Sequence, residues 1–150
     1  YDKPVITVVV DEIESSPDAE IEVRFHSQCK TTINNSYVLI HGDEGKMACI
    51  PCTNEDFIIR SGYHSYLPVK QNARYTRIPF FDTVLAAHTS RTVVVTVIIP
   101  ADNDKDAEKI ARSVKLSTDN DSALTISFAH VNSNYSYRFN RCEAGLVLEK

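Results

Sequence analysis

The amino-acid sequence predicts an all-β protein that folds as one antiparallel β-sandwich. Of its 150 residues, 15 are Val, 13 are Ile and 11 are Thr, against 7 Leu. Such β-branched side chains lose rotamer freedom in a helix and pack well on a pleated sheet, so a helical bundle is excluded. Several segments also alternate apolar and polar residues with period two, as half-buried antiparallel strands do. The length suits a single domain over residues 1–150.

Two kinds of strand are expected in the first half of the chain. Residues 5–10 are apolar on both faces, which is typical of a central strand covered on each side or lying beside a partner. Residues 20–26 alternate, so Ile21, Val23 and Phe25 are expected to face inward and the charged residues between them to face water. Further strands are expected at residues 36–41, 46–50, 57–60 and 74–81.

The second half contains another central strand and one helix. Residues 93–99 are again apolar on both faces. Apolar residues then recur at i, i+3, i+4 and i+7 from Ala107, which predicts a short helix over about 105–113. The last strands are expected at residues 114–117, 122–130, 135–141 and 146–148. About nine or ten short strands of this kind are typical of an immunoglobulin-like or jelly-roll sandwich.

The charge of the chain limits the classes of partner. Sixteen Lys and Arg against twenty Asp and Glu give a net charge of −4, whereas nucleic-acid binding needs clustered positive charge. Residues 57–100 carry five cations and one acid, a net +4, which leaves −8 on the remainder. No apolar run approaches the ~20 residues that cross a bilayer, so no transmembrane segment is expected.

Residues 60–77 form the predicted binding surface. Tyr63, His64 and Tyr66 lie close together in a turn-rich stretch, and aromatic side chains of this kind supply contact area at low entropic cost. The cations expected to add charge beside them are Arg60, Lys70, Arg74 and Arg77. Because interface cores favour Tyr and Arg, we expect a non-enzymatic module that binds another protein through an acidic patch of that partner.

The bonding state of the cysteines indicates the cellular compartment of the protein. Cys49 and Cys52 are three residues apart, so on one strand they point to opposite faces and each is expected to bond Cys29 or Cys142 instead. Two disulfides would place the protein outside the cell or on its surface. Glycosylation sequons compatible with that location occur at Asn34, Asn120 and Asn134.

Zinc is the alternative role for these cysteines. His26 and Cys29 form one half-site, Cys49 and Cys52 form a second, and their separation is that of ribbon-type zinc sites. Residues 41–52 also resemble the middle of RING fingers, although the flanking C-x-x-C pairs of that family are absent. With zinc or with free thiols, the protein would be cytoplasmic.

The acidic loop 102–108 offers a second function. Asp102, Asp104 and Asp106 are spaced at every second residue, which can bring carboxylates together on Ca²⁺. Residues 16–25 resemble a strand of calcium-dependent C2 domains, and that resemblance implies lipid or glycan binding. The same acids also have a structural explanation, because acids before a helix complement its N-terminal partial charge.

No motif of catalysis is found in the sequence. Neither a G-x-S-x-G elbow nor an H-E-x-x-H pair occurs, and the four Gly form no phosphate-binding loop. A hydrolytic enzyme with a site assembled from dispersed residues is the third alternative, and we expect no enzymatic activity.

Overall fold

The computed structural model describes residues 5–65, 77–119, 122–143 and 145–149. Within these ranges the chain forms twelve strands and one helix, which confirms the all-β class. The expected helix is α1 (Asp104–Ser113). Every expected strand has a counterpart in the described ranges, although residues 74–76 of the strand expected at 74–81 lie outside them, and the additional strand is β3 (Lys30–Ile33), a short polar segment.

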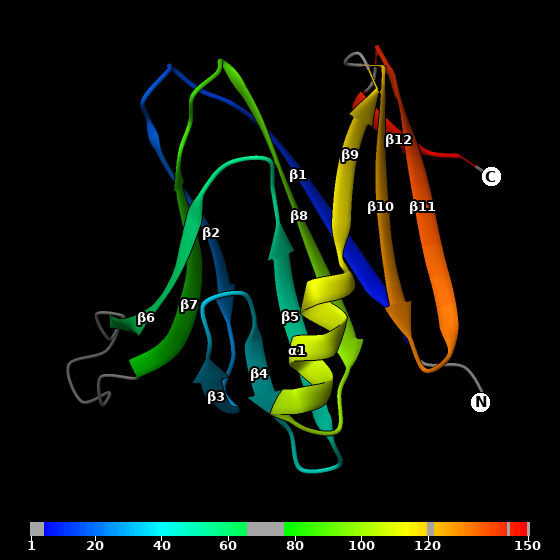
Figure 1. The fold of residues 1–150 in the computed structure, drawn as a ribbon. Coiled ribbons are helices and arrows are strands. Elements are labelled where there is room, and N and C mark those ends of the chain that lie inside the picture. Colours follow the sequence, from blue (N-terminus) through cyan, green and yellow to red (C-terminus); the bar gives the residue numbers. More distant parts are fainter. Residues whose placement is uncertain (1–4, 66–76, 120–121, 144, 150) are drawn as a thin grey trace.

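The strands form three antiparallel sheets stacked as layers (Figure 1). The central sheet has the order β1 (Thr7–Glu14), β8 (Arg91–Pro100), β5 (Lys46–Cys52), β4 (Val38–His41) and β3. One face is covered by α1 and by the C-terminal sheet, in the order β12 (Gly145–Leu148), β11 (Ser133–Cys142), β10 (Ala123–His130) and β9 (Lys115–Asp119). The other face is covered by the lateral sheet, in the order β2 (Glu20–His26), β7 (Arg77–Ala86) and β6 (Phe57–Ser65).

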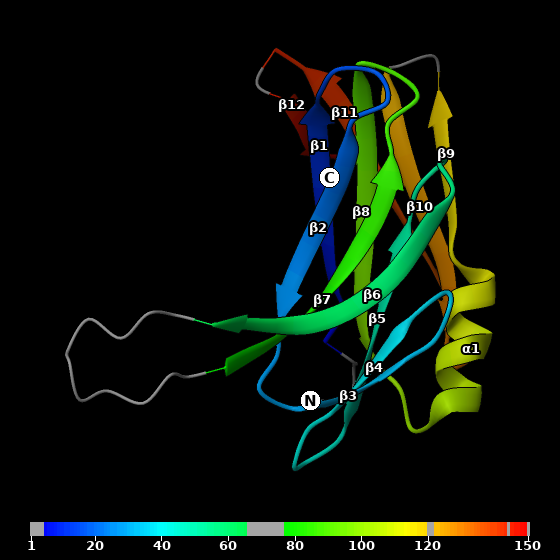
Figure 2. The same cartoon turned by 90° about the vertical axis from the view of Figure 1, so that its left-hand side faces the viewer.

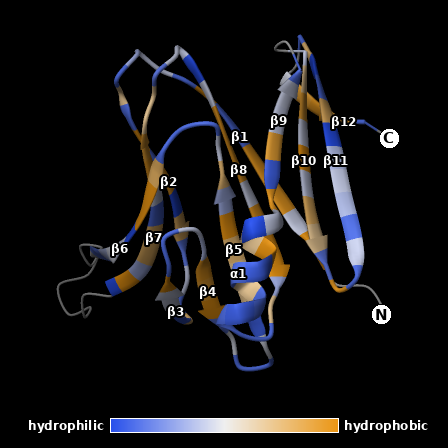
Figure 3. Cartoon of the chain, viewed as in Figure 1, coloured by the Kyte–Doolittle hydropathy of each residue, from blue (hydrophilic) through white to orange (hydrophobic). Residues whose placement is uncertain are grey.

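Strand β8 is buried on both of its faces, as its sequence predicts. Val95 and Val97 pack with α1 and β10 in the largest core cluster. Val94 and Ile98 point the other way and contact the lateral sheet. Figure 3 shows the hydrophobic character of the central strands beside the more hydrophilic β11 and α1. The sandwich therefore has a core on each side of its central sheet.

Strand β1 matches its prediction in part, because it lies beside a partner, β8, but is not central. It is an edge strand of the central sheet, its residues are half-buried or exposed, and Val5 just before it is 75% exposed. An edge position gives a strand only one neighbour, so the apolar run that predicted full coverage is only partly covered here.

Helix α1 begins where the chain supplies a cap. The side chain of Asn103 accepts hydrogen bonds from the backbone N–H groups of Lys105 and Asp106, at 3.0 and 3.1 Å. Ala107 and Ile110 are buried against the C-terminal side of the core. The helix thus packs by its apolar stripe, as the spacing predicts.

The β10–β11 hairpin closes through a two-residue loop of left-handed backbone. His130 pairs with Ser133, and between them Val131 has φ 43° and Asn132 has φ 58°. Asn tolerates this region, whereas a β-branched residue is strained there. Val131 is also 73% exposed, so its side chain gains little from packing.

Val131→Asn is therefore expected to raise the free energy of unfolding by about 1 kcal/mol, because Asn fits a left-handed turn position without the strain of a branched Cβ. Urea unfolding measures the change. The control is Val147→Asn, at an exposed position of β12, where no gain is expected. A variant no more stable than the parent protein would show that the loop relieves the strain in another way.

Candidate functional site

The predicted binding surface falls on the β6–β7 hairpin. Residues 66–76, with Tyr66, Lys70 and Arg74, lie outside the described part of the chain. Strand β2 pairs with β7 as far as Phe80. Strands β6 and β7 continue beyond this point for three more cross-strand pairs, of which the last joins Ser65 and Arg77. Figure 2 shows this end of the hairpin extending away from the three layers.

Tyr63, on the described part of this hairpin, has 67% of its surface in solvent. It pairs with Pro79, and the next residue, His64, is exposed as well and packs edge-on against His26 at 6.5 Å between ring centroids. The structure thus brings His64 together with a histidine of β2 that the sequence does not link to it, whereas Tyr63 alternates to the opposite face of β6.

Phe80 explains why β6 carries a glycine. A Cβ on Gly62 would lie 2.6 Å from Cζ of Phe80, so the far edge of this ring occupies the space that any other side chain would need. The guanidinium of Arg24 lies 3.8 Å from the centre of the same ring, and His26 packs against it at 6.2 Å. Ring, guanidinium and imidazoles therefore form one aromatic cluster on the outward face of the lateral sheet.

A buried carboxylate lies next to this cluster. Asp82 is completely buried and accepts two hydrogen bonds from Arg24, at 2.7 Å from Nε and 2.8 Å from Nη2. The hydrogen bond to Asp82 raises the pKa of Arg24 above its ordinary value. Because buried charges need partners, this pair organises the outward face of the sheet.

The same acid changes the role of Arg60. Its guanidinium lies 3.6 Å from Asp82 and 3.7 Å from Glu20, and it also contacts Glu22. From the sequence, Arg60 is expected to face the partner, but acids of its own sheet surround it. Arg77, at the start of β7, is exposed and remains the described cation nearest the predicted surface.

The four cysteines are free thiols in the structure. Cys29 and Cys142 are exposed, whereas Cys49 is buried against the lateral sheet. Cys52 lies on the opposite face of β5, as its spacing from Cys49 predicts. Burial raises the pKa of the Cys49 thiol to about 12. The disulfide pairing stays a prediction.

Neither the zinc nor the calcium hypothesis is supported by a cluster of ligands among the described residues. Among the described residues no three His, Cys, Asp or Glu side chains are placed to hold a metal ion. Because Cys49 and Cys52 lie on opposite faces of one strand, the zinc set with His26 and Cys29 does not converge.

The acids of the predicted calcium loop interact with the start of α1. A carboxylate oxygen of Asp106 accepts the backbone N–H of Asp102 at 3.1 Å. The backbone carbonyl of Asp104 accepts a hydrogen bond from the Tyr37 hydroxyl at 3.1 Å. Calcium binding at this loop stays a prediction.

Two sequons can be located. Asn34 is exposed in the turn after β3, and Asn134 is exposed on β11, whereas Asn120 lies outside the described ranges. Glycosylation at these positions stays a prediction.

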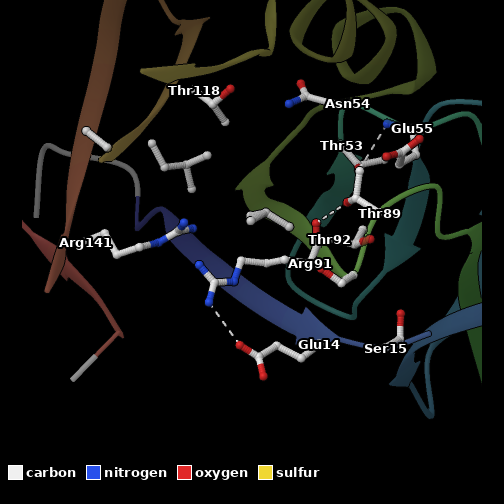
Figure 4. Close-up of a pocket in the computed structure, with 14 residues that line it drawn as sticks. Glu14, Ser15, Thr53, Asn54, Glu55, Thr89, Arg91, Thr92, Thr118 and Arg141 are labelled. Atoms are coloured by element: carbon white, nitrogen blue, oxygen red, sulfur yellow. Dashed lines mark hydrogen bonds and ion pairs between the residues drawn. The ribbon is translucent and has the colours of Figure 1, made fainter. Parts of the chain in front are cut away.

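A second site lies at one end of the sandwich, between the central and C-terminal sheets. It is a cavity of about 830 Å³, and Figure 4 shows Arg91 of β8 and Arg141 of β11 extending toward each other across it. No sequence motif marks this cleft. Its one signal is periodicity, since the inward alternation of Tyr135, Tyr137 and Phe139 puts Arg141 on the same inward face.

The comparisons with known proteins give no family for the chain. No family model, no curated protein and no solved structure matches it. Within the described ranges, α1 is too short and too polar to span a membrane.

Replacing Asp82 tests whether its ion pairs with Arg24 and Arg60 stabilise the fold. Asp82→Asn is expected to lower the free energy of unfolding by about 2 kcal/mol, since an amide cannot balance the two guanidiniums around it. The matched control is Asp119→Asn, an exposed acid 3.5 Å from Arg138, for which a change close to zero is expected in the same urea experiment. Equal effects of the two substitutions would contradict a special role for Asp82.

The cysteines predict a pattern of reactivity. In reduced, folded protein at pH 8, a thiol reagent is expected to modify Cys29 and Cys142 and to spare Cys49, because a thiol with a pKa of about 12 carries almost no thiolate. Peptide mapping identifies the modified residues, and urea should expose Cys49. Counting the reactive thiols in urea without reductant then separates free cysteines, of which all four react, from the two expected disulfides, which would leave no thiol to react.

Proposed function

We propose that the protein is a non-enzymatic, secreted or cell-surface module that binds another protein through the β6–β7 hairpin. The observation that carries this proposal is the two-thirds exposure of Tyr63 on a hydrogen-bonded part of the hairpin that extends beyond β2. Large aromatic side chains supply much of the energy of protein interfaces, so an exposed Tyr on a paired strand is a suitable anchor.

The aromatic cluster supports the proposal by holding this part of β6 in place. Phe80 packs over Gly62, immediately before Tyr63, and His64 immediately after it contacts His26. A side chain presented from an ordered backbone loses less conformational entropy on binding than one in a free loop.

The charge of the surface supports an acidic partner. Arg77 pairs with Ser65 at the outer end of the described hairpin, and Lys70 and Arg74 lie between these two residues in the sequence. Because Arg60 is balanced by its own sheet, these three cations carry the expected attraction. Charges at an interface rim mainly speed association, while buried aromatic anchors slow dissociation.

Capture from cell-surface and secreted proteins tests the proposal. A partner retained by the parent protein is expected to bind Tyr63→Ala roughly thirtyfold more weakly, about 2 kcal/mol, mainly through faster dissociation. Arg77→Ala is expected to slow association and to weaken its dependence on salt. Surface plasmon resonance separates the two rates.

The matched control is Val147→Ala, which removes an exposed apolar side chain from β12 on a different sheet. A partner that binds the Tyr63 variant as well as the control would contradict the hairpin as the binding surface.

A further inference from the structure

The cleft between the central and C-terminal sheets has the size and the walls of a ligand site. Its volume of about 830 Å³ lies within the range of small-molecule pockets. Val93, Ala123 and Leu124 give it an apolar part, and the remaining lining residues are polar or charged.

Hydroxyl groups dominate that polar wall. Six of the fourteen lining residues carry one, and they come from β8 and β9 and from the segments that follow β1, β5 and β7. These residues are Ser15, Thr53, Thr89, Ser90, Thr92 and Thr118. A hydroxyl both donates and accepts hydrogen bonds, so this wall is complementary to a ligand that itself carries several hydroxyls.

Arg141 brings hydrogen-bond donors that the described residues do not use. Its side chain is 21% exposed, and its Nη2 binds Glu12. Its Nε and Nη1 are buried and have no hydrogen-bond partner among the described residues. Buried donors of a charged group are costly to leave unpaired, and a planar guanidinium fits a carboxylate best.

Two glutamates of β1 fix the positions of the arginines. Glu14 lies 3.0 Å from Nη2 of Arg91, and Glu12 lies 3.8 Å from Nε of Arg91 while it also binds Arg141. The carboxylates therefore hold the two guanidiniums next to each other on the β1 side of the cleft.

Glu55, the other acid that lines the cleft besides Glu14, can accept hydrogen bonds from the hydroxyl groups of a sugar. The Glu55 carboxylate lies 3.7 Å from His88, and Asn54 beside it adds an amide to the wall. Carboxylate and amide groups accept hydrogen bonds from ligand hydroxyls, so this end complements the hydroxyl groups of a sugar ring while the Arg141 end complements an acid.

We propose that this cleft binds a saccharide that carries a carboxylate, with the acid group at Arg141 and the ring hydroxyls along the Ser, Thr, Asn54 and Glu55 wall. The site is separate from the β6–β7 hairpin, because no described residue of β6 or β7 lines it.

Titration with sodium glucuronate, glucose and sodium acetate tests the assignment. Followed by ¹H–¹⁵N NMR, glucuronate is expected to bind at least tenfold more tightly than glucose or acetate, and to shift the amide signals of Thr53, Thr89 and Thr118. Glucose and glucuronate of equal affinity would overturn the role given to Arg141. Shifts confined to other parts of the molecule, or no shifts with glucuronate, would overturn the site itself.

Arg141→Gln is expected to weaken glucuronate binding at least tenfold and to leave glucose binding unchanged. The control is Arg138→Gln on the same strand, an exposed arginine paired with Asp119 and Glu149 that does not line the cleft. Unchanged binding by the Arg141 variant would overturn the proposal. Should that variant fold poorly, the amide shifts of the parent protein decide the question alone.

Discussion

Burial of β8 on both of its faces is the constraint on which the three layers depend. Val94, Val95, Val97 and Ile99 have no exposed surface, and they divide between the two cores on either side of the central sheet. Each fully buried side chain of this type contributes about 1.5–3 kcal/mol relative to an exposed one. A strand that is apolar on both faces needs a layer on each side, so the lateral and C-terminal sheets are both required.

The two outer sheets differ from the central sheet because only one face of each is covered. Each buries one face against the central sheet, and its other face is open to polar chemistry. On the lateral sheet this outward face holds Asp82 and its arginines beside the Phe80 ring. The C-terminal sheet shows the reverse case, because Arg141 lies on its inward face at the end where the two sheets leave a cleft. Polar sites thus occur on the outward face of an outer sheet, or at the end of two packed sheets where the core between them stops.

The sequence carries the information for the fold more directly than for the sites. Runs apolar on both faces, period-two alternation and the spacing at Ala107 predict the strands and α1, because each depends on residues close together in the chain. Strand β3 has no such pattern, because its residues 30–33 are few and mostly polar. The partners of Asp82 lie on β2 and β6, and a single sequence does not give their register. An acid inside the apolar segment 78–85 is nevertheless a signal of a buried charge.

The cleft shows how register creates a site that no motif announces. Glu12 lies opposite Val93 and Glu14 opposite Arg91, so the β1–β8 pairing puts both carboxylates beside the arginine of β8. The β10–β11 hairpin then sets Arg141 opposite the same end of β1, where it meets Glu12. A shift of one residue in either pairing would turn these side chains to the other face of their sheets. The charged centre of the cleft is therefore a consequence of the same register that fills the core, and the stability of that core is what keeps the donors of Arg141 in position.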